Sequence, residues 1–354
     1  MTLTNDLALA FMILSACVYP ARFEECVVSC AGDGTCPVGF TCSAEGLCHS
    51  VGAAETCAEV LGTFPSCTGL AVSCGPGRDE DCCSTASPIT GGTFFRSHDA
   101  AADGMYSSTS YPATVSPFVL DRFEVTVGRF RKFVEAGLGT QANPPPSGAG
   151  ARRLNGMAGR GGWDTSWNAS LAADAGALIA AVKCNANMSW TDTPGANEEL
   201  PINCVTWHEA FAFCVWDEGF LPTEAEWNFA ASGGAEQRAF PWSTPPGSTV
   251  INCSFANYEP CSTGVGVRQV GYSPMGDGRY GQSDLDGNVA EWTLDEYQAA
   301  YPDPCVDCAF TGTTGQKTLR GGGFASSADA LRTAVRNPKT SSLRGGDIGI
   351  RCAR

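Results

Sequence analysis

The chain has 354 residues, of which 43% are hydrophobic and 17% charged, and it contains 42 glycines and 19 cysteines. This composition excludes global disorder, and the length is enough for about two loop-rich folded units. The 37 acidic and 22 basic side chains give a net charge of −15, which repels phosphate backbones, so nucleic acid is excluded as a partner. So many cysteines are typical of an exported, disulfide-bonded protein and not of one kept in a reducing cytosol.

The first predicted element is an export signal. Residues 7–14 form an uncharged apolar run that ends in Leu14-Ser15-Ala16-Cys17, which resembles the lipobox of bacterial lipoproteins. The resemblance implies a signal segment over residues 1–17 that is cut before Cys17, whose acylated thiol then anchors a lipoprotein to the bacterial cell envelope. The alternative is an ordinary cleavable signal with Cys17 in a disulfide, which would give a secreted protein. No other apolar stretch approaches the ~20 residues that span a bilayer, so we expect membrane contact through the lipid alone.

A cysteine-rich segment follows the signal. Ten cysteines lie between Cys26 and Cys83, and eight lie between Cys184 and Cys352. Because both numbers are even, each group can pair within itself. The close spacing in the first group is weakly similar to EGF-like repeats and predicts a small disulfide module over residues 18–87, in which each bridge contributes ~2–4 kcal/mol. Zinc is disfavoured because the segment does not supply two Cys-x-x-Cys knuckles.

A second domain is predicted from residue 88 to residue 354, because the cysteine-rich pattern ends near residue 87 and strand and helix patterns follow. Residues 91–96 predict a short strand, and residues 115–125 predict another. Thr126 is placed to cap a helix that ends at Gly137. A long irregular loop rich in proline and glycine comes next, over residues 139–162.

Two capping boxes then predict two helices. Each box is a threonine followed three residues later by a glutamate, Thr206 with Glu209 and Thr223 with Glu226. The threonine hydroxyl accepts a hydrogen bond from the third amide of the helix, and the glutamate reaches back to the cap amide. Both helices are rich in aromatic residues, which we expect to lie mainly in the core.

Short motifs stand in a fixed order along this second domain. They occupy residues 121–126, 201–216, 220–234, 240–242, 287–292, 320–324, 331–337 and 349–354. Together they resemble the motifs of the formylglycine-generating enzyme, or sulfatase-modifying factor, family over residues 88–354. The resemblance implies an α+β, loop-rich variant of the C-type lectin fold. It also implies a disulfide between Cys214 and Cys352 that ties the central helix to the C-terminal strand.

The chain differs from the active members of this family at the residues that bind copper. Those members oxidise a substrate cysteine to formylglycine with copper held by two cysteines, which follow the Arg-Gly-Gly element. Here Ser326 occupies the first of these positions, and no cysteine occurs between Cys308 and Cys352. A serine cannot replace a thiolate as a Cu(I) ligand, so we do not expect copper. A nucleophilic role for Ser326 is disfavoured because no histidine stands beside it.

Calcium is the metal that the resemblance supports best. The family site maps onto the side chains of Asp284 and Glu291 and the carbonyl groups of Gly287 and Val289, and hard oxygen ligands suit Ca²⁺. The alternative is that Asp284 and Glu291 only cap turns. Iron is not expected, because the three histidines are scattered singly, and we expect His208 to have a surface or helix-capping role and not to bind a metal.

Two functions from different classes remain open at this point. The first is a non-catalytic accessory module that binds a protein, peptide or glycan in a groove near Trp242, Trp292, Phe324 and Arg336. The second is an oxidoreductase of the formylglycine-generating type that acts on a protein cysteine through another metal arrangement. The missing cysteine pair favours the first.

Overall fold

The computed structural model describes residues 40–42, 48–50, 64–151, 162–262, 264–310 and 315–354. The expected acylation site at Cys17 and most of the cysteine-rich module lie outside the described residues. In that module, strands β1 (Phe40–Cys42) and β2 (Cys48–Ser50) pair antiparallel. No helix of the described residues combines the length and the apolar character that crossing a membrane requires.

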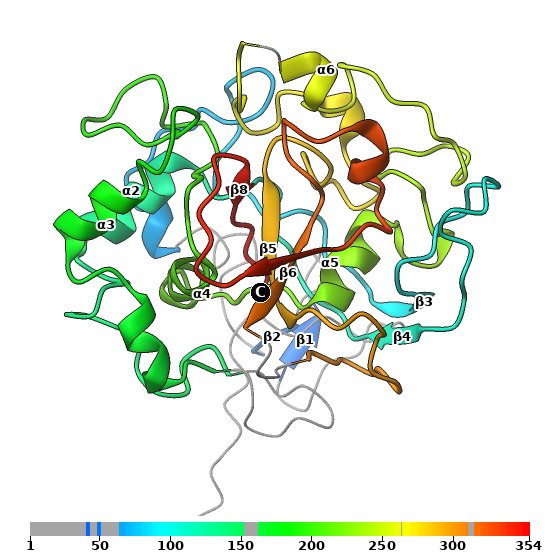
Figure 1. The fold of residues 1–354 in the computed structure, drawn as a ribbon, viewed down its shortest axis with the longest axis horizontal. Coiled ribbons are helices and arrows are strands. Elements are labelled where there is room, and N and C mark those ends of the chain that lie inside the picture. Colours follow the sequence, from blue (N-terminus) through cyan, green and yellow to red (C-terminus); the bar gives the residue numbers. More distant parts are fainter. Residues whose placement is uncertain (1–39, 43–47, 51–63, 152–161, 263, 311–314) are drawn as a thin grey trace, which may run out of the picture.

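A four-stranded sheet with the order β7-β6-β5-β8 forms the centre of the second domain (Figure 1). Strand β5 (Ala290–Glu296) pairs antiparallel with β6 (Gln316–Arg320), and β6 pairs antiparallel with β7 (Asn337–Thr340). The short strand β8 (Ile348–Gly349) joins the other edge of β5 in parallel. Every residue of β5 is buried, because both faces of the sheet are covered.

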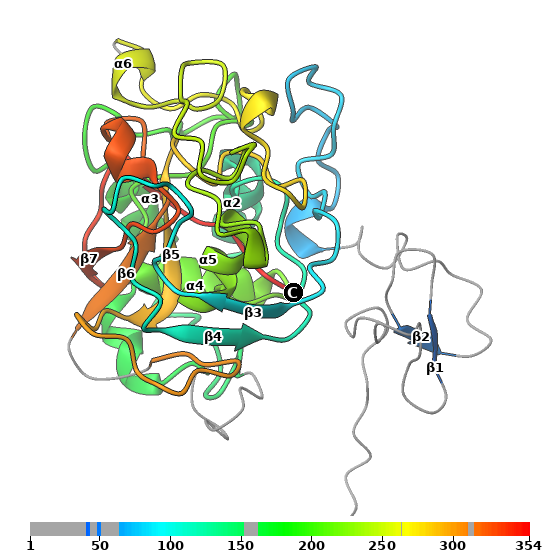
Figure 2. The same cartoon turned by 90° about the vertical axis from the view of Figure 1, so that its right-hand side faces the viewer.

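Helices cover the two faces of this sheet, as Figures 1 and 2 show. Helices α2 (Val127–Glu135), α3 (Ala175–Ala181) and α4 (Trp207–Trp216) share one core with Trp292 and Leu294 of β5. Helix α5 (Glu224–Ala231) packs on the other face, between the sheet and the hairpin of β3 (Gly92–Phe95) and β4 (Pro112–Val115). Along β5, Trp292 and Leu294 therefore face the first core, whereas the neighbouring Glu291 faces α5, where it accepts a hydrogen bond from Trp227.

The helices begin where their caps predict. Thr126 accepts the amide hydrogen of Arg129, and both capping boxes, at Thr206 and Thr223, are present in full. The remaining helical elements of the described residues are one or two turns long, namely Pro65–Cys67, Thr165–Ser170, Gly234–Glu236, Glu259–Ser262 (α6), Pro274–Gly276 and Ala328–Leu331. The fold is thus α+β and rich in loops, as the motifs imply.

Two local expectations are wrong. The strand expected over residues 115–125 ends at Val115, and Phe118 makes only an isolated bridge, because the intervening Pro117 has no N–H to continue a ladder. His208 is 7% exposed, among the rings of Trp163, Trp167 and Trp207, and not on the helix surface. Burial lowers the pKa of this histidine to about 4.

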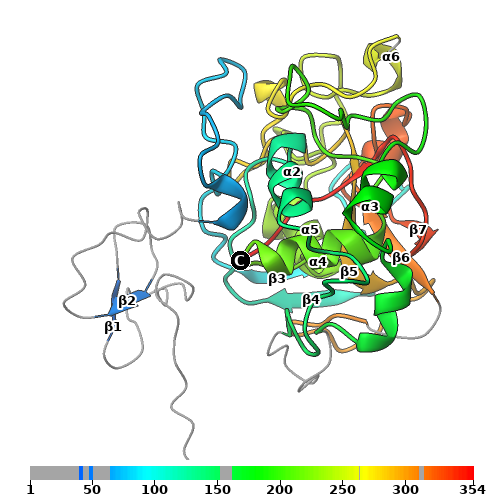
Figure 3. The ribbon, with the colours of Figure 1, turned by 90° about the vertical axis from the view of Figure 1, so that its left-hand side faces the viewer.

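The domain begins earlier than the expected boundary between residues 87 and 88. The disulfides Cys67–Cys83 and Cys74–Cys82 hold a segment over residues 64–87, and its first turn packs beside α2 (Figure 3). The Ser66 amide donates to Asp217 Oδ1 at 2.9 Å, and its hydroxyl accepts from Arg129 Nε at 2.9 Å. This segment is therefore part of the second domain and not of a separate module.

Ser66 contacts a buried cluster of charges, the Arg129 cluster, which consists of Asp121, Arg129, Asp217 and Arg354. Arg129 pairs with Asp121 at 3.0 Å and with Asp217 at 2.6 Å, and the C-terminal Arg354 pairs with the same two carboxylates. The aspartates and Arg129 are each 1% exposed or less. The cluster joins the N-terminal segment, α2, the end of α4 and the C-terminus.

Candidate functional site

The loop after β6 carries Ser326, the residue expected from the motifs to stand in place of the family's first copper cysteine. Gly321 has φ 84°, and a Cβ there would lie 2.3 Å from the Leu285 carbonyl oxygen, so only glycine fits. Ser326 Oγ accepts the amide hydrogen of Gly323 at 3.0 Å, which closes the loop on itself. The hydroxyl thus has a role in the turn.

The cysteines of the second domain do not provide a thiolate pair for copper. All eight cysteines from Cys184 to Cys352 are joined in disulfides, which are Cys184–Cys204, Cys214–Cys352, Cys253–Cys261 and Cys305–Cys308. The Cys214–Cys352 bridge is the pairing that the family resemblance implies. Because disulfide sulfurs are poor ligands and no thiol remains among these eight residues, this domain does not fit a Cu(I) ion held by two cysteines.

A cavity of about 460 Å³ lies beside this loop. Its apolar wall includes Phe324, Leu200 and Val267, and its rim includes Met188, whose side chain is 40% exposed. Its polar lining residues are Asn187, Asn197 and Ser262. An apolar wall with a few amide and hydroxyl groups is typical of sites that bind a small molecule or an extended segment of chain.

The element expected to bind calcium is held by an arginine instead. Glu291 is fully buried, its Oε1 atom pairs with Arg351 at 2.8 Å, and its Oε2 atom accepts from Trp227 Nε1 at 2.6 Å. Asp284 Oδ2 accepts the amide hydrogen of Gly271 at 2.5 Å. Burial raises the pKa of Asp284 to about 6, and no group of three or more acidic, histidine or cysteine side chains in the described part of the chain is arranged to hold a metal ion.

The side chains at the expected calcium positions therefore do not fit Ca²⁺ as they are arranged. Ca²⁺ needs six to eight oxygen ligands, and both oxygens of Glu291 are already taken by cationic or neutral donors. The carbonyl groups of Gly287 and Val289 remain in the backbone between Asp284 and Glu291, but two carbonyl groups alone do not make a calcium site.

The four residues expected to line one groove do not lie together. Trp292 is fully buried and donates to the Val205 carbonyl group, so it cannot face a ligand. Trp242 stacks on Phe240 with ring centroids 4.9 Å apart. Of the four, Phe324 borders the large cavity, whereas Arg336 lines a different pocket.

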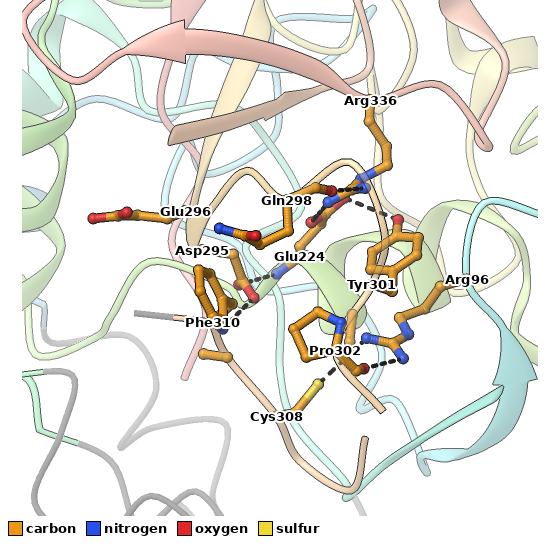
Figure 4. Close-up of a pocket in the computed structure, with 12 residues that line it drawn as sticks. Arg96, Glu224, Asp295, Glu296, Gln298, Tyr301, Pro302, Cys308, Phe310 and Arg336 are labelled. Carbon is orange, nitrogen blue, oxygen red and sulfur yellow. Dashed lines mark hydrogen bonds and ion pairs between the residues drawn. The ribbon is translucent and has the colours of Figure 1, made fainter. Parts of the chain in front are cut away.

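That second pocket, with a volume of about 40 Å³, surrounds the start of α5 (Figure 4). Glu224 lies at its base and pairs with Arg320 at 2.8 Å and with Arg336 at 2.5 Å. Tyr301 donates to Glu224 Oε1 at 3.0 Å. Asp295 accepts the amide hydrogen of Glu224 at 2.7 Å, so the carboxylate of Asp295 caps the helix. The network links α5, β5, β6 and the segment before β7.

The charges in this network have opposite effects on its two carboxyl groups. Burial tends to raise the pKa of Glu224, but Arg320 and Arg336 outweigh it and hold the pKa below its ordinary value. Burial, followed by the charge of Glu224, raises the pKa of Asp295 to about 7. Glu224 therefore stays ionised, and its carboxylate holds the guanidinium groups of two arginines in place.

Sequence reasoning missed this network and also missed Glu124 and Asp286. Glu124 is buried and accepts from Asn288 Nδ2 at 2.6 Å and from the Val289 amide at 3.1 Å. Asp286 is 2% exposed, and neither carboxylate oxygen has a partner among the described residues. Glu224, in the first turn of α5, was the one sequence signal for the network around it. An acidic residue at that position is also common on exposed helices, so the signal was not specific.

Comparison with known proteins identifies the family of this chain. The model of the sulfatase-modifying factor enzyme 1-like domain matches residues 76–354, so the chain belongs to that family. The inactive C-alpha-formylglycine-generating enzyme 2 of Bos taurus is 34% identical over 165 residues, which are 44% of this chain and 50% of that protein. The chain thus spans about half the length of that relative.

Two further similar proteins support the assignment. The formylglycine-generating enzyme of Thermomonospora curvata is 29% identical over 270 residues, which are 68% of this chain and 82% of that protein. The solved structure of PvdO from Pseudomonas aeruginosa matches with a TM-score of 0.53 and 21% identity over 76% of this chain and 93% of that one. At that identity the match shows the fold. The family start at residue 76 also lies before the expected boundary at residue 88.

Proposed function

We propose that this protein is a non-catalytic member of its family, an accessory module that binds an extended peptide in the cavity beside Phe324. The observation that carries the proposal is the chemistry of the loop: Ser326 stands where a thiolate is required, and the eight cysteines of residues 184–352 are paired. A domain that keeps the family fold without the copper ligands keeps a surface for recognition and loses the oxidation. The similarity to a relative named as inactive supports the same conclusion.

The lining of the cavity supports a peptide as the ligand. The amide groups of Asn187 and Asn197 can pair with peptide backbone, and the apolar wall at Leu200 and Val267 can take a side chain. A glycan is less well suited, because sugars stack on an exposed aromatic face and Phe324 is only 8% exposed. The net charge of −15 favours neutral or basic peptides over acidic ones.

A matched pair of methionine variants tests the binding site. Met188 lines the cavity and is 40% exposed, whereas Met275 is 59% exposed and does not line it. The probe is a phage-displayed library of random peptides, selected on the wild-type protein and then measured one by one. We expect Met188→Ala and Phe324→Ala to weaken binding of the selected peptides at least about fivefold, because each removes a contact worth ~1–2 kcal/mol. Met275→Ala should bind them like the wild type.

The opposite pattern would reject the cavity as the site. If the selected peptides bind equally to wild type and Met188→Ala, they bind elsewhere. If no peptide is selected but a glycan array gives binders that Phe324→Ala loses, the ligand is a glycan.

We also propose that the protein is held at the bacterial envelope through Cys17. The support is the apolar run and the small residues before this cysteine. Mass spectrometry of the mature N-terminal peptide should find a lipid on Cys17, and Cys17→Ala should release the protein from the membrane fraction. A mature N-terminus without lipid would show that the signal is an ordinary cleavable one.

A further inference from the structure

The disulfide Cys305–Cys308 differs in its surroundings from the other bridges of the domain. It closes a Cys-x-x-Cys sequence with a separation of 3, and Cys308 lines the pocket of Figure 4. Cys305 is 4% exposed, whereas Cys308 is only partly buried. Cys308 is therefore the more accessible residue of the two. Cys-x-x-Cys pairs with one accessible sulfur are a common arrangement for thiol–disulfide exchange.

A buried cation lies against the accessible sulfur. Arg96 is 3% exposed, and its Nη1 atom donates to Cys308 Sγ at 3.7 Å. Its Nη2 atom donates to the carbonyl groups of Pro302, at 2.8 Å, and Pro112, at 3.5 Å. The Nε atom is buried and has no partner among the described residues. The direct hydrogen-bond partners of this guanidinium are thus neutral, while the carboxylates of Glu224, Asp295 and Asp303 act on its charge from farther away. A negative charge on Cys308 Sγ would give the guanidinium a counter-ion in direct contact.

The loop that carries the disulfide is fixed by other bonds. The Thr114 amide donates to the Cys305 carbonyl group at 2.9 Å, and the Asp307 amide donates to the Thr114 carbonyl group at 2.8 Å. Beyond the second cysteine, the Phe310 amide donates to Asp295 Oδ1 at 2.8 Å. These contacts anchor the loop to β4 on one side and to β5 on the other. Opening the disulfide therefore leaves the loop in place.

We propose that Cys305 and Cys308 form a thiol–disulfide exchange site in which Cys308 is the sulfur that reacts with an external thiol. The thiolate of a reductant attacks Cys308 Sγ, a mixed disulfide forms, and the electron pair of the broken bond leaves on Cys305 Sγ, which takes a proton from water. A second thiolate attacks the reductant's sulfur in the mixed disulfide. The products are the oxidised reductant and a Cys308 thiolate beside Arg96, so two thiols have supplied two electrons.

The size of the pocket limits what can reach this sulfur. Its volume of about 40 Å³ admits a slender thiol group and not a folded surface. The external thiol is therefore a small thiol such as glutathione or a cysteine on an extended peptide. This inference is independent of the proposed peptide cavity, which is lined by other residues.

Controlled reduction of the full chain tests the site. The protein is incubated with increasing glutathione or, in parallel, with a short peptide that contains one cysteine; free thiols are then trapped with maleimide and mapped by mass spectrometry. We expect Cys305–Cys308 to open at thiol concentrations at least about tenfold lower than Cys214–Cys352, which is fully buried. The mixed disulfide should be found on Cys308. The arm that reacts identifies the source of the thiol, and reaction in neither arm overturns the proposal.

Variants test the part played by Arg96. In Cys305→Ser, alkylation of Cys308 at pH 6 should slow roughly tenfold when Arg96→Met is added. Removing the positive charge should raise the pKa of the Cys308 thiol by about one unit, which lowers the fraction of thiolate about tenfold. Arg96→Lys should keep most of the rate. Equal rates with and without Arg96→Met would overturn the role of Arg96. If Arg96→Met does not fold, Cys308 in Cys305→Ser is compared with Cys305 in Cys308→Ser, and faster alkylation of Cys305 overturns the assignment.

Discussion

Single buried charges decide how stable this domain is at a given pH. Asp286 has no partner for either carboxylate oxygen among the described residues, and burial, followed by the charge of Glu291, raises its pKa well above the ordinary value. A carboxyl group with a raised folded-state pKa binds its proton more tightly in the folded state. The free energy of unfolding therefore falls as the pH rises from about 4, the unfolded pKa, toward the folded one.

Asp286→Asn should remove this dependence. The amide has nearly the same shape and no charge, so we expect the variant to be more stable than the wild type at pH 7 by roughly 1–3 kcal/mol. The difference should shrink toward zero near pH 4. Denaturant unfolding of both proteins at pH 4 and pH 7 measures this difference in the free energy of unfolding. A gain over the wild type that is smaller at pH 7 than at pH 4 would contradict this role of Asp286.

Glu224 is the opposite case, because its charge is needed. It pairs with Arg320, which is buried, and with Arg336, which is partly buried, so Glu224→Gln leaves two guanidinium groups without their anion. We expect a loss of about 3–5 kcal/mol in the free energy of unfolding. Glu135→Gln, at the exposed end of α2, is the control and should change stability by less than about 0.5 kcal/mol. Similar losses in both variants would show that the network has no special role.

At the scale of elements, the loop between Asp284 and Glu291 tests whether the family's calcium site operates here. Because Arg351 and Trp227 occupy the Glu291 carboxylate, we expect the same melting temperature in added Ca²⁺ and in chelator. Binding at a hundredfold excess over Kd would instead add ~2.7 kcal/mol. A rise of several degrees in Ca²⁺, lost in Glu291→Gln, would mean that the ion displaces Arg351.

The elements that the sequence predicts well are those with local signals. A threonine cap acts within its own first turn, so α2, α4 and α5 begin at the predicted residues. The strand expected up to residue 125 failed at Pro117, because a ladder depends on a distant partner as well as on local pattern. The expectation of one groove was wrong for the same reason. An aromatic residue in a motif can lie in the core or at the surface, and contacts with distant segments decide that Trp292 is buried.

The candidate site was predictable in its chemistry and not in its shape. The expectation that the copper cysteines are missing rests on Ser326 and its neighbours in the sequence alone. The cavity beside Phe324 depends on Met188 and Asn187, which lie far away in the chain and show no motif. The buried salt bridges of Glu224 and Arg351 likewise join residues from distant segments.

At the scale of the whole molecule, the segment over residues 64–87 closes the Arg129 cluster. Arg354 stacks on the Phe64 ring at 3.4 Å, and Ser66 donates to Asp217. A chain that starts at residue 88 loses these contacts and exposes paired charges, so we expect it to be about 3–5 kcal/mol less stable than a chain that starts at residue 64. Equal denaturant midpoints would place the domain boundary at residue 88 after all.

The central claim is that this domain keeps the family fold without the family oxidation. The most direct measurement is to incubate the purified protein, loaded with copper, with a Cys-x-Pro-x-Arg peptide, and to follow the mass of the peptide. We expect the cysteine to remain a cysteine, with or without copper. Conversion of that cysteine to the formylglycine aldehyde, faster than in a control without protein, would contradict it.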